Sequence, residues 1–444
     1  MAPDEAAAEH RTVEDILREG GFTSFHWKVV SVTGFAWTFV AMEILLISFV
    51  VGVVAARFGM DEFTVSLVLS GTLMGSFLGS LALGRMADRW GRRPVFQVSI
   101  LWYSIFTAMA ALSWDTWSLF SFRLLAGLGL GGMLVVDPSL LSEYLPPQHR
   151  GRFLVFLDFF WPVGFIVALG LSYFFLVLQD GAWRLLFLAA AFPAFMAFLF
   201  RLWIPESPYY LAKTGYRERA AKVLTKVTGR DVDPGLLKEE VKGERVPMRN
   251  LMSKGLARVT AVIVVVWIAL NFSYYGLFLW LPQTLPRIQG FSVGDIYFNI
   301  LLAALAQFPG YALAFLLVEA WGRKRTLAAF LILGGLSAYV FATATSYAWF
   351  VFGLFFVSFF NLGAWGAVYP FTSESLPTKL RSTGFGLAEG VGKVTAILGP
   401  VIFGTLLTLT DNVVLPITSV AVVMVLGGVV AAILGTETRG KPLL

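Results

Sequence analysis

The sequence predicts an all-α membrane protein with twelve transmembrane helices in two pseudo-symmetric six-helix bundles, and three observations lead to this fold class. First, 57% of the 444 residues are hydrophobic and only 14% are charged, whereas an average soluble chain is roughly 45–50% apolar and about 25% charged. Second, the apolar residues gather in long runs, and a helix needs about 20 of them to cross a bilayer. Third, charged motifs recur at one fixed distance along the chain. A soluble enzyme, a nucleic-acid-binding protein and a secreted domain are therefore largely excluded.

Charged breaks separate the apolar runs into two sets of six, one in each half of the chain. No apolar segment with a cleavage site precedes the first run, so we expect no signal peptide. The first set is predicted near 29–56, 63–84, 95–113, 117–142, 153–178 and 183–204, and the second near 258–283, 295–318, 326–344, 347–373, 383–408 and 413–435.

These runs predict five consecutive regions. Residues 1–28 form an N-terminal segment, 29–204 the first bundle and 258–435 the second bundle. Between the bundles lies 205–257, which is rich in Lys, Arg and Glu and has the apolar spacing of short surface helices. Residues 436–444 form a tail.

Lysine and arginine residues are spread unevenly over the loops. The chain has 34 of them and a net charge of +6, and all but five lie at the termini or in one alternate set of loops. Because basic loops stay in the cytoplasm, both termini are expected there, with the chain in the plasma (cell inner) membrane. The same distribution argues against nucleic acid as a partner. The five exceptions are Arg57, Arg184 and Arg287 in the other loops, and Arg123 and Lys393 inside predicted spans.

The sequence contains few residues that could bind a metal ion or a cofactor. The chain contains no cysteine, and His10, His26 and His149 fall outside the predicted spans. We therefore expect no cysteine- or histidine-based metal site, no histidine proton relay and no cofactor.

Three charged segments repeat at a distance of 231 residues. One offset shared by separate segments predicts two six-helix halves that arose as parallel repeats, related by an axis along the membrane normal. The matching pairs are Gly91 and Gly322, Arg92 and Arg323, Glu143 and Glu374, Pro146 and Pro377, Arg150 and Arg381, and Glu206 and Glu437.

Several of these motifs carry a family resemblance. The segment Gly84-Arg85-Met86-Ala87-Asp88-Arg89-Trp90-Gly91-Arg92-Arg93 resembles the signature between the second and third helices of the major facilitator superfamily. The resemblance implies two bundles around a central cavity and transport by alternating access. Three further motifs resemble those of sugar porters: Arg123-x-x-x-Gly127-x-Gly129-x-Gly131-Gly132, Pro205-Glu206-Ser207-Pro208 and Glu437-Thr438-Arg439-Gly440-Lys441. Two others resemble motifs of nicotinate permeases and of organic cation and anion transporters: Asn271-Phe272-Ser273-Tyr274-Tyr275-Gly276 and Gln307-x-Pro309-Gly310-Tyr311.

Carboxylates and arginines at the predicted cytoplasmic ends form a candidate gate. A carboxylate there accepts charge-assisted hydrogen bonds from arginines and from a helix N-terminus, which would tie the two halves together. By resemblance, such ion pairs close the cytoplasmic side when the protein opens outward; arginines that only fix the topology are the alternative. The candidate gating residues are Asp88, Arg89, Arg92, Arg93, Glu143, Arg150, Glu206, Glu319, Arg323, Glu374, Arg381 and Glu437.

Glu43 is the first candidate for proton coupling. An ionisable residue inside a span costs roughly 2.5–3.5 kcal/mol on insertion scales, so it should face the bundle interior or a wet cavity. Glu43 lies in the middle of the first span, where many proton-coupled members of the resembled family carry an acidic residue. Val40 departs from related permeases, which often have a second Asp at that position. A substrate contact or a structural ion pair is the alternative role for Glu43.

Asp158 and Glu389 are a second candidate pair, again 231 residues apart. In sugar porters the position of Asp158 usually holds an amide that binds substrate, so Asp158 is a candidate for both proton coupling and substrate binding. A gate pair at the cytoplasmic end is the alternative for both residues.

Two further charges lie in the fourth span. Asp137, near its cytoplasmic end, is as compatible with solvation at the interface as with function. Arg123, placed near its outer end, is expected either to snorkel to the interface or to take part in function. The glycines between them, at 127, 129, 131 and 132, predict close packing on a neighbouring helix.

Lys393 is the position most informative about the substrate. By resemblance, sugar porters have an aromatic residue there and organic-anion transporters an arginine. A buried cation beside a cavity attracts a carboxylate, or else neutralises Glu389 four residues earlier on the same helix face. Amide and aromatic side chains expected around it suit a small ring-bearing polar molecule. They are Asn271, Tyr274, Tyr275, Gln307, Asn361 and Trp365.

These features predict a secondary transporter, and not an enzyme, that takes up a small organic ion together with protons. An aromatic or pyridine carboxylate such as nicotinate is the expected substrate, and a sugar, a polyol or an organic cation is the alternative. The alternatives to a transporter are a channel and a non-transporting receptor of the same fold. We expect a monomer in the lipid bilayer whose partners are its substrate and protons.

Overall fold

The computed structural model describes the chain except residues 1–10, 194–202, 238–246, 254, 290 and 440–444. The described part is helical and has no strand, only an isolated bridge between Arg11 and Leu237. Ten of its helices are long and apolar enough to cross a membrane. The all-α membrane fold predicted from the sequence is confirmed.

The N-terminal half contains six predicted spans. Its fifth span is broken into three pieces, and the end of the predicted sixth span, 183–204, falls partly on residues 194–202, which lie outside the described residues. The elements are α2 (Ser24–Phe58), α3 (Glu62–Trp90), α4 (Arg92–Ala110), α5 (Thr116–Tyr144), α6 (Pro147–Asp158), α7 (Phe160–Ser172), the π-helix η1 (Tyr173–Leu178) and α8 (Trp183–Ala190).

The C-terminal half repeats this order with a continuous fifth span, α17. Here the first span is the one that divides, into α12 and the short α13. The elements are α12 (Ala257–Phe278), α13 (Leu281–Gln289), α14 (Val293–Ala320), α15 (Arg323–Thr343), α16 (Tyr347–Glu374), α17 (Thr378–Thr410) and α18 (Val414–Leu434).

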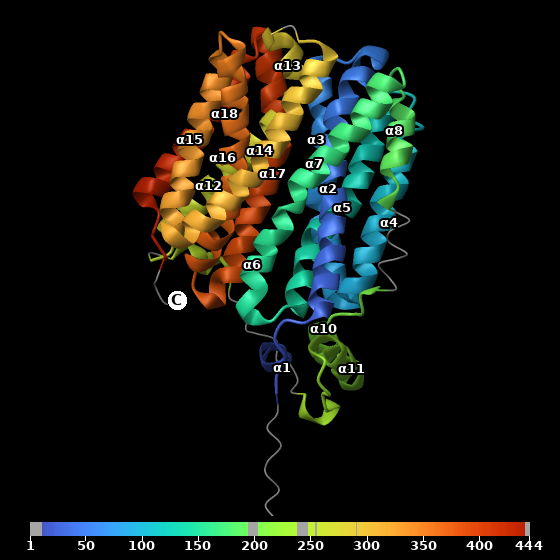
Figure 1. Ribbon diagram of the computed structural model, residues 1–444, viewed down its shortest axis with the longest axis vertical. Helices are drawn as coiled ribbons and strands as arrows, with labels where there is room; N and C mark the ends of the chain where they lie inside the picture. Colours follow the sequence, from blue (N-terminus) through green and yellow to red (C-terminus); the bar gives the residue numbers. More distant parts are fainter. Residues whose placement is uncertain (1–10, 194–202, 238–246, 254, 290, 440–444) are drawn as a thin grey trace, which may run out of the picture.

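The two halves stand side by side, and the helices outside them gather at one end of the molecule (Figure 1). We call this end the linker end and the other, which carries α13, the opposite end. The helices at the linker end are α1 (Val13–Gly20), α10 (Pro208–Lys213) and α11 (Arg217–Thr228), with the 3-10 turns η2 (Pro234–Leu236) and η3 (Met248–Met252) in the same segments of the chain.

The first span begins earlier than predicted, at Ser24 instead of residue 29. His26 therefore lies within α2, which corrects its placement outside the spans. Its Nδ1 accepts the backbone N–H of Thr23 at 2.8 Å, so the histidine caps the helix start.

Glycines of α5 let it pack closely on α3, as predicted. A Cβ on Gly131 would lie 2.0 Å from the carbonyl oxygen of Ser76, and one on Gly75 would lie 1.9 Å from that of Leu124. Only glycine fits such a backbone approach. Between the halves, α3 packs on α17, α2 on α13 and α7 on α14.

Candidate transport site

Two arginines at the linker end organise the candidate gate residues. Arg92, the first residue of α4, contacts Asp88 at 2.9 Å and Glu143 at 3.0 Å. Arg323, the first residue of α15, repeats this arrangement with Glu319 at 3.1 Å and Glu374 at 2.9 Å. In this structure these ion pairs stay within one half, and the expectation that the motif ties the halves together when the protein opens outward stays a prediction. The pairs stay within one half because each arginine is flanked by the two helices that pack on its own.

Glu206 and Glu437 each hold the start of one of these helices. Glu206 accepts the backbone N–H groups of Arg92 at 2.9 Å and Arg93 at 3.3 Å, and Glu437 accepts that of Arg323 at 3.0 Å. A carboxylate at a helix N-terminus interacts favourably with the helix dipole. We call each set of arginine, its acidic partners and this glutamate a clamp.

The clamps explain the glycines that precede the two arginines. Gly91 and Gly322 have φ angles of 104° and 114°, where other residues are strained. A Cβ on either would also come within 2.4 Å of a carboxylate oxygen, of Glu206 at 2.3 Å and of Glu437 at 2.4 Å.

The remaining gate candidates lie beside the clamps. The backbone carbonyl of Arg89 accepts the hydroxyl of Tyr210 at 2.9 Å, and Arg150 at the start of α6 donates to the carbonyl of Leu145 at 3.2 Å. Arg381 lies in the first turn of α17.

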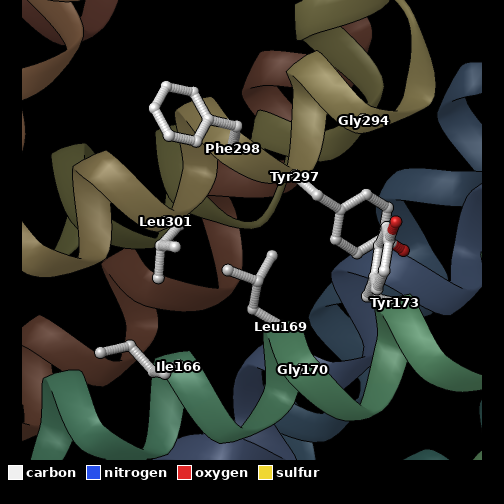
Figure 2. Close-up of a pocket in the computed structure, with 8 residues that line it drawn as sticks. All are labelled: Ile166, Leu169, Gly170, Tyr173, Gly294, Tyr297, Phe298 and Leu301. Atoms are coloured by element: carbon white, nitrogen blue, oxygen red, sulfur yellow. The ribbon is translucent and has the colours of Figure 1, made fainter.

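At the opposite end, side chains of the two halves contact each other directly. Arg287 contacts Glu62 at 2.7 Å, and the Ser70 hydroxyl donates to the carbonyl of Ile397 at 2.8 Å. Figure 2 shows the rings of Tyr173 and Tyr297 next to each other, with centroids 5.2 Å apart, beside a pocket of ≈ 310 Å³ that residues of α7, η1 and α14 line. The structure is therefore closed at this end, and the pocket contains none of the predicted substrate-binding residues.

Glu43 and Arg123 form an ion pair inside the N-terminal half. Arg123 Nη1 lies 3.0 Å from Glu43 Oε2, and the Thr107 hydroxyl donates to the same oxygen at 2.9 Å. Both ions are 0% exposed. The expectation that Arg123 snorkels is wrong, because it lies about two turns inside α5 and points at α2. Its Nε donates to the Thr72 hydroxyl at 3.1 Å.

Asp137 is also buried. Its exposure is 0%, and neither carboxylate oxygen has a hydrogen-bond partner. This corrects the expectation of solvation at the interface. The side chain lies inside the bundle although Asp137 is only two turns from the end of α5.

Asp158, Glu389 and Lys393 meet between the halves. Asp158 ends α6 and is within electrostatic reach of Glu389 on α17. Lys393 Nζ lies 3.7 Å from Glu389 Oε1, which is a loose ion pair, and it is buried with no hydrogen-bond partner. The three N–H donors of the ammonium group are therefore available to an acceptor on a ligand.

An aromatic cluster lies beside these charges. Trp267 of α12 has its ring centroid 5.8 Å from those of Trp365 and Tyr369 and 5.4 Å from that of Phe385. Phe385 is four residues before Glu389, so the cluster and the charges share a face of α17. Of the four rings only Trp365 was predicted; the position of Trp267, four residues before Asn271, was a signal for it.

Aromatic residues of both halves complete the site. Trp161 of α7 donates a hydrogen bond to the hydroxyl of Tyr274, and the ring of Tyr311 lies 5.5 Å from that of Phe159. Tyr275 interacts electrostatically with Glu389. Trp161 and Tyr311 were not predicted as site residues.

The predicted amides are buried in the C-terminal half. Asn271 donates to the carbonyl of Trp267 at 2.9 Å, and Asn361 donates to the Ser273 hydroxyl at 2.7 Å. The carbonyl oxygens of Gln307 and Asn361 have no hydrogen-bond partner. Both remain available to a donor on a ligand.

Comparisons with known proteins agree with this geometry. Residues 22–444 match the family model described as "Sugar (and other) transporter". The chain is 36% identical over 424 residues to the niacin transporter NiaP of Acinetobacter baylyi, which covers 94% of this chain and 96% of that protein. It is 33% identical over 418 residues to the putative niacin/nicotinamide transporter NiaP of Bacillus subtilis, at 94% and 97% coverage.

Among solved structures, the chain resembles the partially occluded inward-open conformation of the xylose transporter XylE from E. coli. The TM-score is 0.75 at 17% sequence identity, over 95% of this chain and 100% of that chain. This likeness confirms the fold of two six-helix bundles.

Proposed function

Since the chain belongs to the sugar (and other) transporter family, we propose that it takes up a small aromatic carboxylate together with a proton, with nicotinate as the first candidate. The observation that carries this proposal is Lys393, a buried ammonium group held only loosely by Glu389 and placed beside an aromatic cluster. A carboxylate bound there would supply the missing acceptor, and an aromatic ring would pack on Trp267 and its neighbours. The names of the two relatives support nicotinate.

Glu43 is the proposed proton carrier. In the ionised state it holds Arg123, and a proton on its carboxylate removes half of this buried pair. Because an uncompensated buried charge is costly, the free guanidinium group then drives a rearrangement of α2 against α5. Asp158 is the second proposed proton site, at the boundary between the halves.

Alternating access is proposed as rocking of the two halves. The linker end faces the cytoplasm, in line with its excess of Lys and Arg, so the closed opposite end makes this state inward-facing. The clamps keep each half rigid while the contacts between halves change. The protein is placed in the cell inner membrane and acts as a monomer.

Uptake of radiolabelled nicotinate into proteoliposomes tests the proposal. For one proton per nicotinate anion, an inward gradient of about one pH unit should drive about tenfold accumulation, because tenfold corresponds to about 1.4 kcal/mol. Glu43→Gln should abolish the response to the gradient, and Lys393→Met should abolish binding. Nicotinamide, which lacks the carboxylate, is the matched control ligand and should not compete. Accumulation that ignores the gradient would contradict proton coupling.

An organic cation is the second candidate, because Asp158 and Glu389 outnumber Lys393 in the site. Under this alternative the amine lies between the two carboxylates and Lys393 has only a structural role. Lys393→Met would then keep or increase transport, whereas Asp158→Asn would abolish it.

A further inference from the structure

Asp137 is a buried carboxylate that the proposed mechanism does not use. It lies on α5, 14 residues after Arg123, which is about 21 Å and four turns along the same helix. The two residues therefore lie on nearly the same face. An ionised carboxylate without a partner is unfavourable in such a setting, so the carboxyl group is expected to hold a proton.

Three hydroxyl side chains lie on the face of α4 that packs on α5. Ser99, Tyr103 and Thr107 follow at four-residue spacing on one face of α4, and all three are buried. Thr107 donates to Glu43 at 2.9 Å, and Tyr103 interacts electrostatically with both Glu43 and Asp137. The hydroxyl of Ser99 has no hydrogen-bond partner.

This face of α4 lies directly on α5. A Cβ on Gly129 would lie 2.7 Å from the backbone nitrogen of Tyr103, and one on Gly132 would lie 2.3 Å from Ser99 Oγ. The two helices run in opposite directions, and Ser99 and Asp137 are each seven residues from the linker end of their helix. They therefore lie at similar depth.

A pocket at the linker end lies close to Asp137 along α5, although Asp137 itself is not among its lining residues. This pocket of ≈ 360 Å³ between α3, α4 and α5 is lined by Val136 and Ser139, which flank Asp137 in α5. Asp88 and Arg92 of the clamp also line it, and Asp88 is 65% exposed. Arg85 is the other charged residue of this pocket.

The C-terminal half shows that the fold does not need these polar groups. At the positions 231 residues later it has Phe330, Gly334 and Ala338 in place of the three hydroxyls, and Val368 in place of Asp137. Phe330, Ala338 and Val368 are buried there as well.

We propose that Asp137 is a second proton-binding residue, and that Thr107, Tyr103 and Ser99 connect it to Glu43 as a route by which the proton leaves for the linker end. The route runs inside the N-terminal half and bypasses the substrate site. Asp137 first releases its own proton toward the linker end; the Glu43 carboxyl group then gives its proton to the hydroxyl chain, and the chain gives a proton to the ionised Asp137. Atoms and charge balance, because each group that gains a proton gives one up.

This inference rests on the proposed proton coupling, and the variant Asp137→Asn separates the two. In proteoliposomes it should exchange nicotinate across the membrane at the wild-type rate but lose the accumulation, about tenfold per pH unit, driven by a gradient. Tyr103→Phe should lose it as well. Ser172→Ala is the matched control, because it also removes a buried hydroxyl without a partner, and should accumulate nicotinate normally.

If wild-type and Asp137→Asn proteins respond alike to the gradient while Glu43→Gln does not, the route is wrong and the proton coupling stands. A wild type that ignores the gradient contradicts the coupling itself.

Two measurements need no substrate. The infrared spectrum of the wild type should contain the carbonyl band of a protonated carboxylic acid that Asp137→Asn lacks; identical spectra would overturn the assignment. Asp137→Val, which installs the residue of the other half, should raise the midpoint of thermal unfolding, and a lower midpoint would show that Asp137 serves the fold.

Discussion

The interiors of the two halves differ at positions that the repeat makes equivalent. Glu43, Thr72 and Arg123 in the N-terminal half correspond to Tyr274, Ala303 and Leu354 in the C-terminal half, and all six are buried. The clamps at the linker end, by contrast, share their main contacts, an arginine paired with two acidic side chains and a glutamate at the start of its helix. A bundle of this design therefore needs its clamp, but it does not need ions in its interior. We infer that the interior ions of the N-terminal half serve transport and lower stability.

The largest expected effect comes from replacing Arg123 by the residue of the other half. Arg123→Leu leaves Glu43 buried without a cation, which should cost about 3–5 kcal/mol of unfolding free energy. Thermal unfolding of the purified protein in detergent measures this loss.

The double variant Glu43→Leu with Arg123→Leu is the control for this experiment. It removes both charges, so its stability should return to that of the wild type or exceed it. A double variant that is no more stable than Arg123→Leu would mean that the pair is needed for folding.

The glutamates of the two clamps should respond to pH in opposite directions. Burial raises the pKa of Glu206 above its ordinary value despite its backbone hydrogen bonds. Burial also acts to raise the pKa of Glu437, but the backbone N–H groups of Arg439, Arg323, Thr438 and Arg325 outweigh it and lower the value. Ionised Glu206 therefore costs stability as the pH rises above 4.5, whereas ionised Glu437 contributes stability that is lost as the pH falls below 4.5.

Thermal unfolding of Glu206→Gln and Glu437→Gln between about pH 7 and about pH 4 measures this difference, with effects of about 0.3–1 kcal/mol. Acid should increase the advantage of the wild type over Glu206→Gln and decrease its advantage over Glu437→Gln. Two variants with the same pH dependence would contradict the assigned shifts.

The smallest effect is expected where the halves touch. Glu62→Gln or Arg287→Gln removes a half-exposed ion pair worth about 0.2–1 kcal/mol, which should increase opening at the opposite end up to about fivefold. The chain has no cysteine, so a Ser66→Cys background reports this opening by its rate of maleimide labelling. The control is Arg57→Gln, which changes another exposed arginine near this end and should leave the labelling rate unchanged. An equal rate in all variants would show that the ion pair does not hold this end closed.

The sequence was sufficient for the fold class and for the partners of the clamps. The thickness of the bilayer sets the length of the apolar runs, so these runs predict the spans. The 231-residue repeat shows that Glu143 and Glu374 occupy equivalent positions in the two halves. The direction of a long side chain is different, because it depends on which helix packs alongside. For this reason an interface position stayed open for both Arg123 and Asp137 beside a functional role, whereas Arg123 points at Glu43 and Asp137 is buried.

Other parts of the site were missed because they depend on tertiary contacts. Trp267 was marked only by its position four residues before Asn271, and nothing local marks Tyr369 and Phe385 in a chain that is 15% aromatic. The packing of α12 on α16 and α17 brings their rings together. No glycine marks the break between α6 and α7 at Phe159, although Pro162 follows closely.

The clamps also decide where the chain tolerates being cut. Each half is completed by a glutamate that lies after its last span: Glu206 for the first and Glu437 for the second. Two fragments expressed separately would therefore need their boundary beyond Ser207, whose N–H also binds Glu206 at 2.9 Å. Likewise, a truncation that removes Glu437 and Thr438 deprives α15 of its N-terminal carboxylate and Glu374 of a hydroxyl donor at 2.7 Å. Residues Glu437 and Thr438 of the tail are thus a structural part of the second half.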